Sequence, residues 1–143
     1  MSNRLKHIIF FFGVLFSFFS CNDEFDEWGY VNMYIDPEST EYFDLNTGRR
    51  GWVYLHGGNR GILVVRNAGY ENTTDAFFAF ERSCVAKGCK GIVEMDESNV
   101  LIVCPDCKST FLTYEGLPVS GKAKRALYAY RTFYDGIYLY IKN

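Results

Sequence analysis

Four of the five cysteines in this chain of 143 residues fall within one short stretch. They are Cys84, Cys89, Cys104 and Cys107, in the pattern C-x4-C-x14-C-x2-C. Thiols that lie this close together in sequence indicate either a metal or iron–sulfur site or a pair of disulfides. The choice between these chemistries depends on the redox compartment, so the targeting signals of the chain bear on it directly.

The first 20 residues have the features of a secretory signal. Arg4 and Lys6 precede an apolar run from Ile8 to Ser20, which is too short to span a bilayer comfortably. Cys21 follows at once and opens an acidic stretch, a pattern that resembles a bacterial lipoprotein signal cleaved before a lipid-bearing cysteine. The alternative is an ordinary signal peptide with a coincidental cysteine. We predict an exported lipoprotein of the bacterial cell envelope, held at the membrane through an anchor on Cys21.

Removal of residues 1–20 leaves enough chain for one domain with a single core. We expect residues 21–45 to be the lipid anchor and a tether leading into the first strands, and residues 46–143 to be the folded domain. Loss of Arg4 and Lys6 leaves 13 basic residues against 17 acids, a formal charge of −4. No basic stripe is visible, so no nucleic-acid partner is predicted. Export permits disulfides without excluding a metal.

The mature sequence predicts an all-β fold built from short strands. Runs rich in aromatic and β-branched residues are separated by Gly, Asn and Asp, which is typical of a small antiparallel β-sandwich or barrel. The predicted strands are residues 52–56, 62–66, 77–81, 91–95, 100–103, 110–114, 127–133 and 137–141. Asp135-Gly136 predicts a tight hairpin between the last two. In the last strand Ile137, Leu139 and Ile141 are expected to face the core.

The cysteines belong to two loops on this strand map. Cys84 and Cys89 follow the strand that ends at residue 81, and Cys104 and Cys107 follow the strand that ends at residue 103. Between them, residues 91–103 predict a hairpin, whose two ends must lie side by side. The sequence therefore predicts a loop-hairpin-loop subdomain that brings the four sulfurs to one place.

These residues resemble the Rieske-type iron–sulfur domains. That family has C-x-H on one loop and C-x-x-H on a second, followed by G-S-x-[FY], a glycine, a G-P-A loop and an aromatic-rich last hairpin. The matching features here are Cys84, Cys104-Pro-Asp-Cys107, Lys108-Ser109-Thr110-Phe111, Gly116, Gly121-Lys122-Ala123, Leu127, Tyr130 and the Asp135-Gly136 turn. The resemblance covers roughly residues 50 to 143. It implies a Rieske-like β-sandwich or barrel and an electron-transfer or redox function with a protein redox partner.

The departures from the family pattern fall on its ligands. Ala86 and Cys107 stand where the two histidine ligands belong, Cys89 has no counterpart among the cluster ligands, and Lys122 replaces the loop proline. A Rieske centre needs two imidazoles on one iron to raise its potential. The only histidine outside the signal, His56, is distant in sequence and is expected to be a loop or partly buried structural residue.

Three occupants of the cysteine site stay open on the sequence. Four thiolates suit a single zinc or iron ion. They also suit a 2Fe-2S cluster held by cysteine alone. Alternatively, no cofactor is present and disulfides, within each loop or across the two loops, hold the hairpin. The resemblance also places the Ser109 hydroxyl against a cluster sulfur and the Phe111 ring beside the site, although a turn hydroxyl and a core aromatic explain them equally well.

No catalytic constellation stands out, so the chain is predicted not to be an enzyme. The leading hypothesis is a redox module, with Cys84, Cys89, Cys104 and Cys107 as metal ligands. The alternative is a cofactor-free binding or assembly module in which the same four residues form structural disulfides. The many tyrosines near the C-terminus suit either a partner surface or cross-strand pairing. The small basic cluster at residues 122–125 is expected to be a solvated turn.

Overall fold

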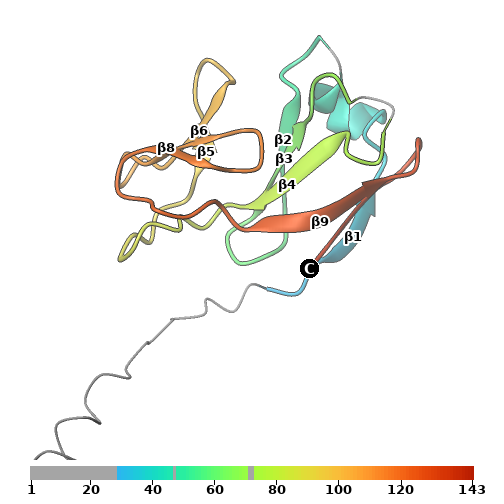
Figure 1. The fold of residues 1–143 in the computed structure, drawn as a ribbon. Coiled ribbons are helices and arrows are strands. Elements are labelled where there is room, and N and C mark those ends of the chain that lie inside the picture. Colours follow the sequence, from blue (N-terminus) through green and yellow to red (C-terminus); the bar gives the residue numbers. More distant parts are fainter. Residues whose placement is uncertain (1–28, 47, 71–72) are drawn as a thin grey trace, which may run out of the picture.

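The computed structural model describes residues 29–46, 48–70 and 73–143, and this part of the chain forms two antiparallel sheets (Figure 1). The larger sheet has the strand order β1-β10-β9-β4-β3-β2 and curls strongly, and the smaller has the order β5-β6-β7-β8. The strands are β1 (Asn32–Ile35), β2 (Trp52–Leu55), β3 (Ile62–Arg66), β4 (Phe77–Glu81), β5 (Glu94–Met95), β6 (Leu101–Val103), β7 (Thr110–Leu112), β8 (Pro118–Ser120), β9 (Ala129–Tyr134) and β10 (Leu139–Lys142). The predicted all-β antiparallel architecture is confirmed.

Helical structure within the described residues is limited to one short 3-10 helix, η1 (Thr40–Leu45). No helix in these ranges has the length and apolar character needed to cross a bilayer. The signal peptide and the lipidation site Cys21, both predicted from the sequence, lie outside the described residues.

Strand β3 explains why the domain has two hydrophobic cores. Its four residues Ile62 to Val65 are all buried, because Ile62 and Val64 point into one core while Leu63 and Val65 point into the other. A strand covered on both faces reads as a continuous apolar run rather than an alternating one. The first core lies within the curl of the large sheet, and the second lies between that sheet and the cysteine-bearing loops.

The predicted and observed strands agree best in the centre of the large sheet, where β3 and β4 have the predicted bounds. The predicted strand at 91–95 is reduced to β5, because Gly91 instead closes the preceding loop by accepting a hydrogen bond from Cys84 N at 3.0 Å. The sequence predicts that Ile137, Leu139 and Ile141 all face the core. Leu139 and Ile141 are buried, but Ile137 is exposed. The Asp135 carboxylate accepts hydrogen bonds from the N–H groups of Ile137 and the residue after it, which holds Ile137 in the turn.

The stretch for which the sequence predicts a tether contains two ordered elements. Strand β1 pairs with β10, with Asn32 opposite Lys142 and Ile35 opposite Leu139, and η1 packs beside β2. Strand β1 is short and its burial pattern does not alternate cleanly, so it carries little periodic signal. Strand β8 was likewise not predicted, since it begins at Pro118, a residue that marks edge strands.

Exposed aromatic residues on the outer strands pair with one another. The Tyr34 ring on β1 lies 5.5 Å from the Tyr138 ring and 6.0 Å from the Tyr140 ring, between centroids. Phe133 on β9 lies 6.2 Å from Tyr140. Such cross-strand pairs stabilise a sheet without any ligand.

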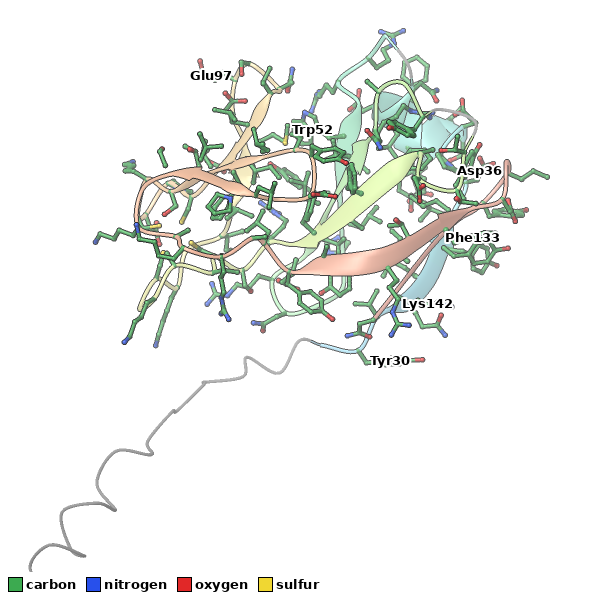
Figure 2. All side chains as sticks on the ribbon, viewed as in Figure 1. Tyr30, Asp36, Trp52, Glu97, Phe133 and Lys142 are labelled. Atoms are coloured by element: carbon green, nitrogen blue, oxygen red, sulfur yellow. The ribbon has the colours of Figure 1, made fainter. Side chains whose placement is uncertain are left out.

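Two side chains of β2 fix the small sheet against the large one. Trp52 Nε1 donates a hydrogen bond of 2.7 Å to Asn99 Oδ1, and Tyr54 Oη accepts one of 2.9 Å from Met95 N. Figure 2 shows Trp52 on the side of the large sheet that faces the hairpin carrying Glu97. The orientation of the β5–β6 hairpin is therefore set at its tip by β2, while its base holds the cysteine loops.

Candidate metal centre

The four clustered cysteines meet at one point. Their Sγ atoms all lie within 4.8 Å of one another. Cys84 and Cys107 Sγ are 3.6 Å apart, and Cys89 and Cys104 Sγ are also 3.6 Å apart. The hairpin at residues 91–103 brings its flanking loops together as the sequence predicts.

Backbone hydrogen bonds shape both cysteine loops. In the first, Cys89 N donates to Ala86 O at 2.9 Å. In the second, Cys104 N donates to Ser109 O at 2.9 Å, and Lys108 N donates to Cys104 O at 2.9 Å. Each loop is thus closed by the main chain, so the thiol positions do not depend on bonds between the sulfurs.

Two glycines allow the loops to approach this closely. A Cβ atom on Gly91 would lie 2.6 Å from Cys104 Sγ, which is nearer than a carbon atom can come. Gly121 has a φ of +89°, and a Cβ there would lie 2.5 Å from the Cα of Ser109. Any larger residue at either place would push one loop away from the sulfurs. The sequence connects Gly121 with the site only through the family resemblance. It gives no sign that Gly91 belongs to the site.

The site lies at the boundary between the second core and solvent. Cys84 and Cys104 are buried within that core, whereas Cys89 and Cys107 are half-buried. Ala86, which stands where the family has its first histidine, is buried among the same apolar side chains. The position of the family's first histidine is therefore occupied by a small side chain that packs in the second core.

The Ser109 hydroxyl contacts a cysteine sulfur and the backbone of another loop, instead of the backbone of its own turn. Its Oγ accepts hydrogen bonds of 3.0 Å from the N–H groups of Lys122 and Ala123, which pins the loop at residues 121–123. The same oxygen lies 3.1 Å from Cys107 Sγ. Phe111, two residues further on in β7, is wholly buried in the second core.

The surroundings of the thiols raise the pKa values of some cysteines and lower that of another. Burial raises the pKa of Cys84 well above its usual range, and burial also raises the pKa of Cys89. Burial acts in the same direction on Cys107, but hydrogen bonds from the side chain and backbone of Ser109 and from neighbouring thiols outweigh it and lower its pKa to about 6. Cys107 is thus the residue whose thiolate form, the form that binds metals, is most favoured.

The geometry of the sulfurs fits one tetrahedral ion. A metal–sulfur bond of about 2.3 Å places the sulfurs of a tetrahedral four-cysteine site about 3.8 Å apart. The observed separations of 3.6 Å and the common limit of 4.8 Å are close to this arrangement. A two-iron cluster needs two ligand pairs on separate irons, and the two histidines of the Rieske type are replaced by Ala86 and Cys107. The residues do not fit the Rieske cluster.

The same geometry selects a pairing for disulfides. The two close contacts, Cys84 with Cys107 and Cys89 with Cys104, each join one loop to the other. The pairs within a loop that the sequence also allows, such as Cys84 with Cys89, lie within the common limit of 4.8 Å as well. A sulfur movement of about 1.5 Å would bring either cross-loop pair to bonding distance.

His56 lies in the loop after β2, is exposed and does not belong to the cysteine group. This differs from the partly buried structural role that was one of its expected roles. No prediction was made for Lys87, Lys90 and Lys108, the exposed lysines of the two cysteine loops, because only the fold brings the loop at residues 121–123 against the second of these loops.

The described residues form a Rieske-like fold in which two loops bring four cysteines together. The crystal structure of the cyanobacterial plasma membrane Rieske protein PetC3 from Synechocystis PCC 6803 is similar to this chain, with a TM-score of 0.52 and 24% sequence identity. The similarity covers 66% of this chain and 88% of that one. No family model matches the sequence, and a search of curated proteins finds no match. The predicted Rieske-like fold is thus confirmed by structure.

Proposed function

We propose that this chain is an exported, membrane-anchored electron-transfer module, not an enzyme, in which one iron ion on four cysteine thiolates takes the place of the Rieske cluster. The observation that carries the proposal is the convergence of four Sγ atoms within 4.8 Å in two loops of a Rieske-like fold. An iron ion with four thiolate ligands supplies one-electron chemistry, whereas zinc in the same position is redox-inactive.

The chain's own residues suit a site of this kind. Cys84 and Cys104 are buried against apolar side chains, which keeps water from two of the four ligands. Cys89 and Cys107 are half-buried, so they offer a path between the site and the surface. Ser109 holds the loop at residues 121–123 over the site and contacts Cys107 Sγ, an arrangement that orients a ligand from its outer side.

Metal analysis of the chain purified without oxygen tests the proposal. We expect about one iron per chain, a visible colour that is lost on reduction, and no acid-labile sulfide. Iron with an equal amount of sulfide would contradict the single-ion site in favour of a cluster. Stoichiometric zinc would leave the tetrahedral site in place but remove the electron-transfer function.

The second candidate function is a cofactor-free binding or assembly module. The close cross-loop contacts of Cys84 with Cys107 and Cys89 with Cys104 favour it, because these bonds would join the two loops as a metal does. Export into an oxidising compartment, which the sequence predicts, would permit them. Mass spectrometry of the non-reduced protein distinguishes the two functions. Peptides joined through both cross-loop pairs would establish this second candidate and contradict any metal site.

Anchoring through Cys21 is tested separately. In Cys21→Ser, signal cleavage and lipid attachment should both fail, so we expect loss of fatty-acid labelling. Cys104→Ser is the matched control, since it changes a cysteine of the folded domain and should keep the label. Labelling with a radioactive or clickable fatty acid measures the result. A Cys21→Ser protein that still carries the label would show that the anchor lies elsewhere.

A further inference from the structure

Basic residues gather around the cysteine site. The loops at residues 84–91, 104–109 and 121–127 together hold six of the chain's 15 lysines and arginines but one of its 17 acids, Asp106. These six residues form what we call the basic patch: Lys87, Lys90, Lys108, Lys122, Lys124 and Arg125. Gly121 packs on the backbone of Ser109, so the third loop lies against the second. The basic patch is therefore carried by the two loops that hold the four sulfurs and by the loop packed against the second of them.

The basic patch takes no part in the ion pairs found among the described residues. All six side chains are on exposed residues. Among the described residues, the recorded ion pairs are Arg50 with Asp44 and Arg66 with Glu38, and neither involves the patch. In Figure 2 long nitrogen-tipped side chains extend outward from the end of the molecule that holds the small sheet. A cluster of one sign with no internal partner produces a positive field at that end.

Two apolar residues in or next to these loops are also exposed. Pro105 is exposed between two of the cysteines, and Ile92 is 37% exposed beside Gly91. The half-buried Cys89 and Cys107 belong to the same loops. Apolar groups among charged residues are a common composition of protein docking surfaces.

We propose that the basic patch is the docking surface for an acidic electron-carrier protein, whose redox group would come to lie against Cys89 and Cys107. The inference rests on the proposed function and names the partner of that site. Opposite charge on the two surfaces would raise the rate of encounter and orient the partner's redox group toward the sulfurs. Docking would weaken steeply with salt, because the patch charges are exposed and are screened beyond about 10 Å at 0.1 M ionic strength.

An acidic protein is favoured over an anionic membrane by where the chain enters the domain. The described chain begins next to β1, on the large sheet, whereas the basic patch lies at the small-sheet end (Figure 1). A surface at that end is free to face a partner in solution. The test must therefore distinguish binding of an acidic protein from binding of a membrane through the same patch.

The test uses the full chain, loaded with zinc and purified in a neutral detergent, and a fluorescein-labelled oligoglutamate peptide as the probe. Fluorescence anisotropy measures affinity at low salt and at about 0.15 M salt, where the screening length is about 8 Å. The patch variant combines Lys87→Glu, Lys108→Glu and Lys124→Glu, one from each loop. The matched control reverses the same number of exposed charges on or beside the large sheet, Arg60→Glu, Arg131→Glu and Lys142→Glu.

We expect the patch variant to lose about tenfold or more in affinity at low salt and the control to lose about twofold or less. Carbodiimide cross-linking should join the probe to lysines of the patch and not to Lys142. Equal losses in both variants, or cross-links spread over the domain, would overturn the proposal. So would protection of the patch lysines from acetylation in vesicles that contain phosphatidylglycerol but not in vesicles of phosphatidylcholine alone, since that pattern indicates a membrane surface.

These readouts do not require iron or electron transfer. If the chain proves to hold no iron but binds the probe through the patch, the electron-transfer function fails while the acidic docking surface stands. If iron is present but the patch variant binds the probe as the native chain does, the docking surface fails alone.

Discussion

Cys104→Ser should reduce the bound metal from about one ion per chain to less than about a tenth of that value at equal metal concentration. Cys104 is wholly buried and its Sγ lies 3.6 Å from Cys89 Sγ, so its loss removes the thiolate that is best shielded from solvent. A serine hydroxyl is shorter than a thiol and remains protonated at neutral pH, which makes it a poor fourth ligand. Because metal binding adds to the free energy of folding, the unfolding temperature of the metal-loaded protein should also fall.

Elemental analysis of the purified protein and thermal unfolding with and without a chelator measure these two effects. Cys21→Ser is the matched control, because it removes the one cysteine outside the cluster and should retain the metal. Cys107→Ser guards against a folding defect at the buried position, since Cys107 is only half-buried and its replacement disturbs the core less. Full metal content in both Cys104→Ser and Cys107→Ser would show that the metal is bound elsewhere in the chain.

The grouping of the cysteines could be predicted because it depends on topology alone. Two loops at the two ends of one hairpin must be neighbours, whatever the details of the hairpin. The partition of the four thiols could not be predicted, because the separations of 3.6 Å between Cys84 and Cys107 and between Cys89 and Cys104 depend on side-chain directions within closed loops. The sequence left disulfides within a loop and across the two loops equally open.

The strands were predictable where burial imposes a clear pattern. Both faces of β3 are covered, so its run of four apolar residues stands out. The pairing of β1 with β10, in contrast, joins residues more than 100 positions apart, and its four residues carry no alternation that marks a strand. The basic patch was missed in part for the same reason, because the loops that carry Lys87 and Lys124 come to the same site only in the fold.

Glu81 shows the limit of sequence reasoning most clearly, because a carboxylate at the end of a predicted strand is ordinarily expected to be solvated. It is 0% exposed. Its Oε2 accepts hydrogen bonds from Asn59 N at 2.8 Å and Tyr130 Oη at 2.6 Å. Its Oε1 accepts from Arg60 N at 2.8 Å and from both the N–H and the hydroxyl of Ser83 at 3.0 Å. The carboxylate therefore ties the loop after β2 and strand β9 to the residue just before Cys84.

Glu81→Gln should lower the free energy of unfolding by about 3 kcal/mol at pH 7. The side chains have the same shape, but the amide NH2 group would face donors, so at least one buried N–H or O–H group would lose its acceptor. Chemical denaturation measures the loss. The matched control is Glu94→Gln on exposed β5, which should change stability by less than about 0.5 kcal/mol.

The difference between the native protein and Glu81→Gln should also depend on pH. Burial raises the pKa of Glu81, but the hydrogen bonds from Tyr130, Asn59, Arg60 and Ser83 outweigh it and hold the pKa below its ordinary value of 4.5. A carboxyl group whose pKa is lower in the folded state stabilises the fold above its unfolded pKa and loses that contribution as the pH falls toward the folded value. The stability difference should therefore be constant near neutral pH and shrink below about pH 4.5. If the stability difference between the two proteins stays constant down to pH 3, Glu81 is not the ionised acceptor that connects the loop after β2 with β9.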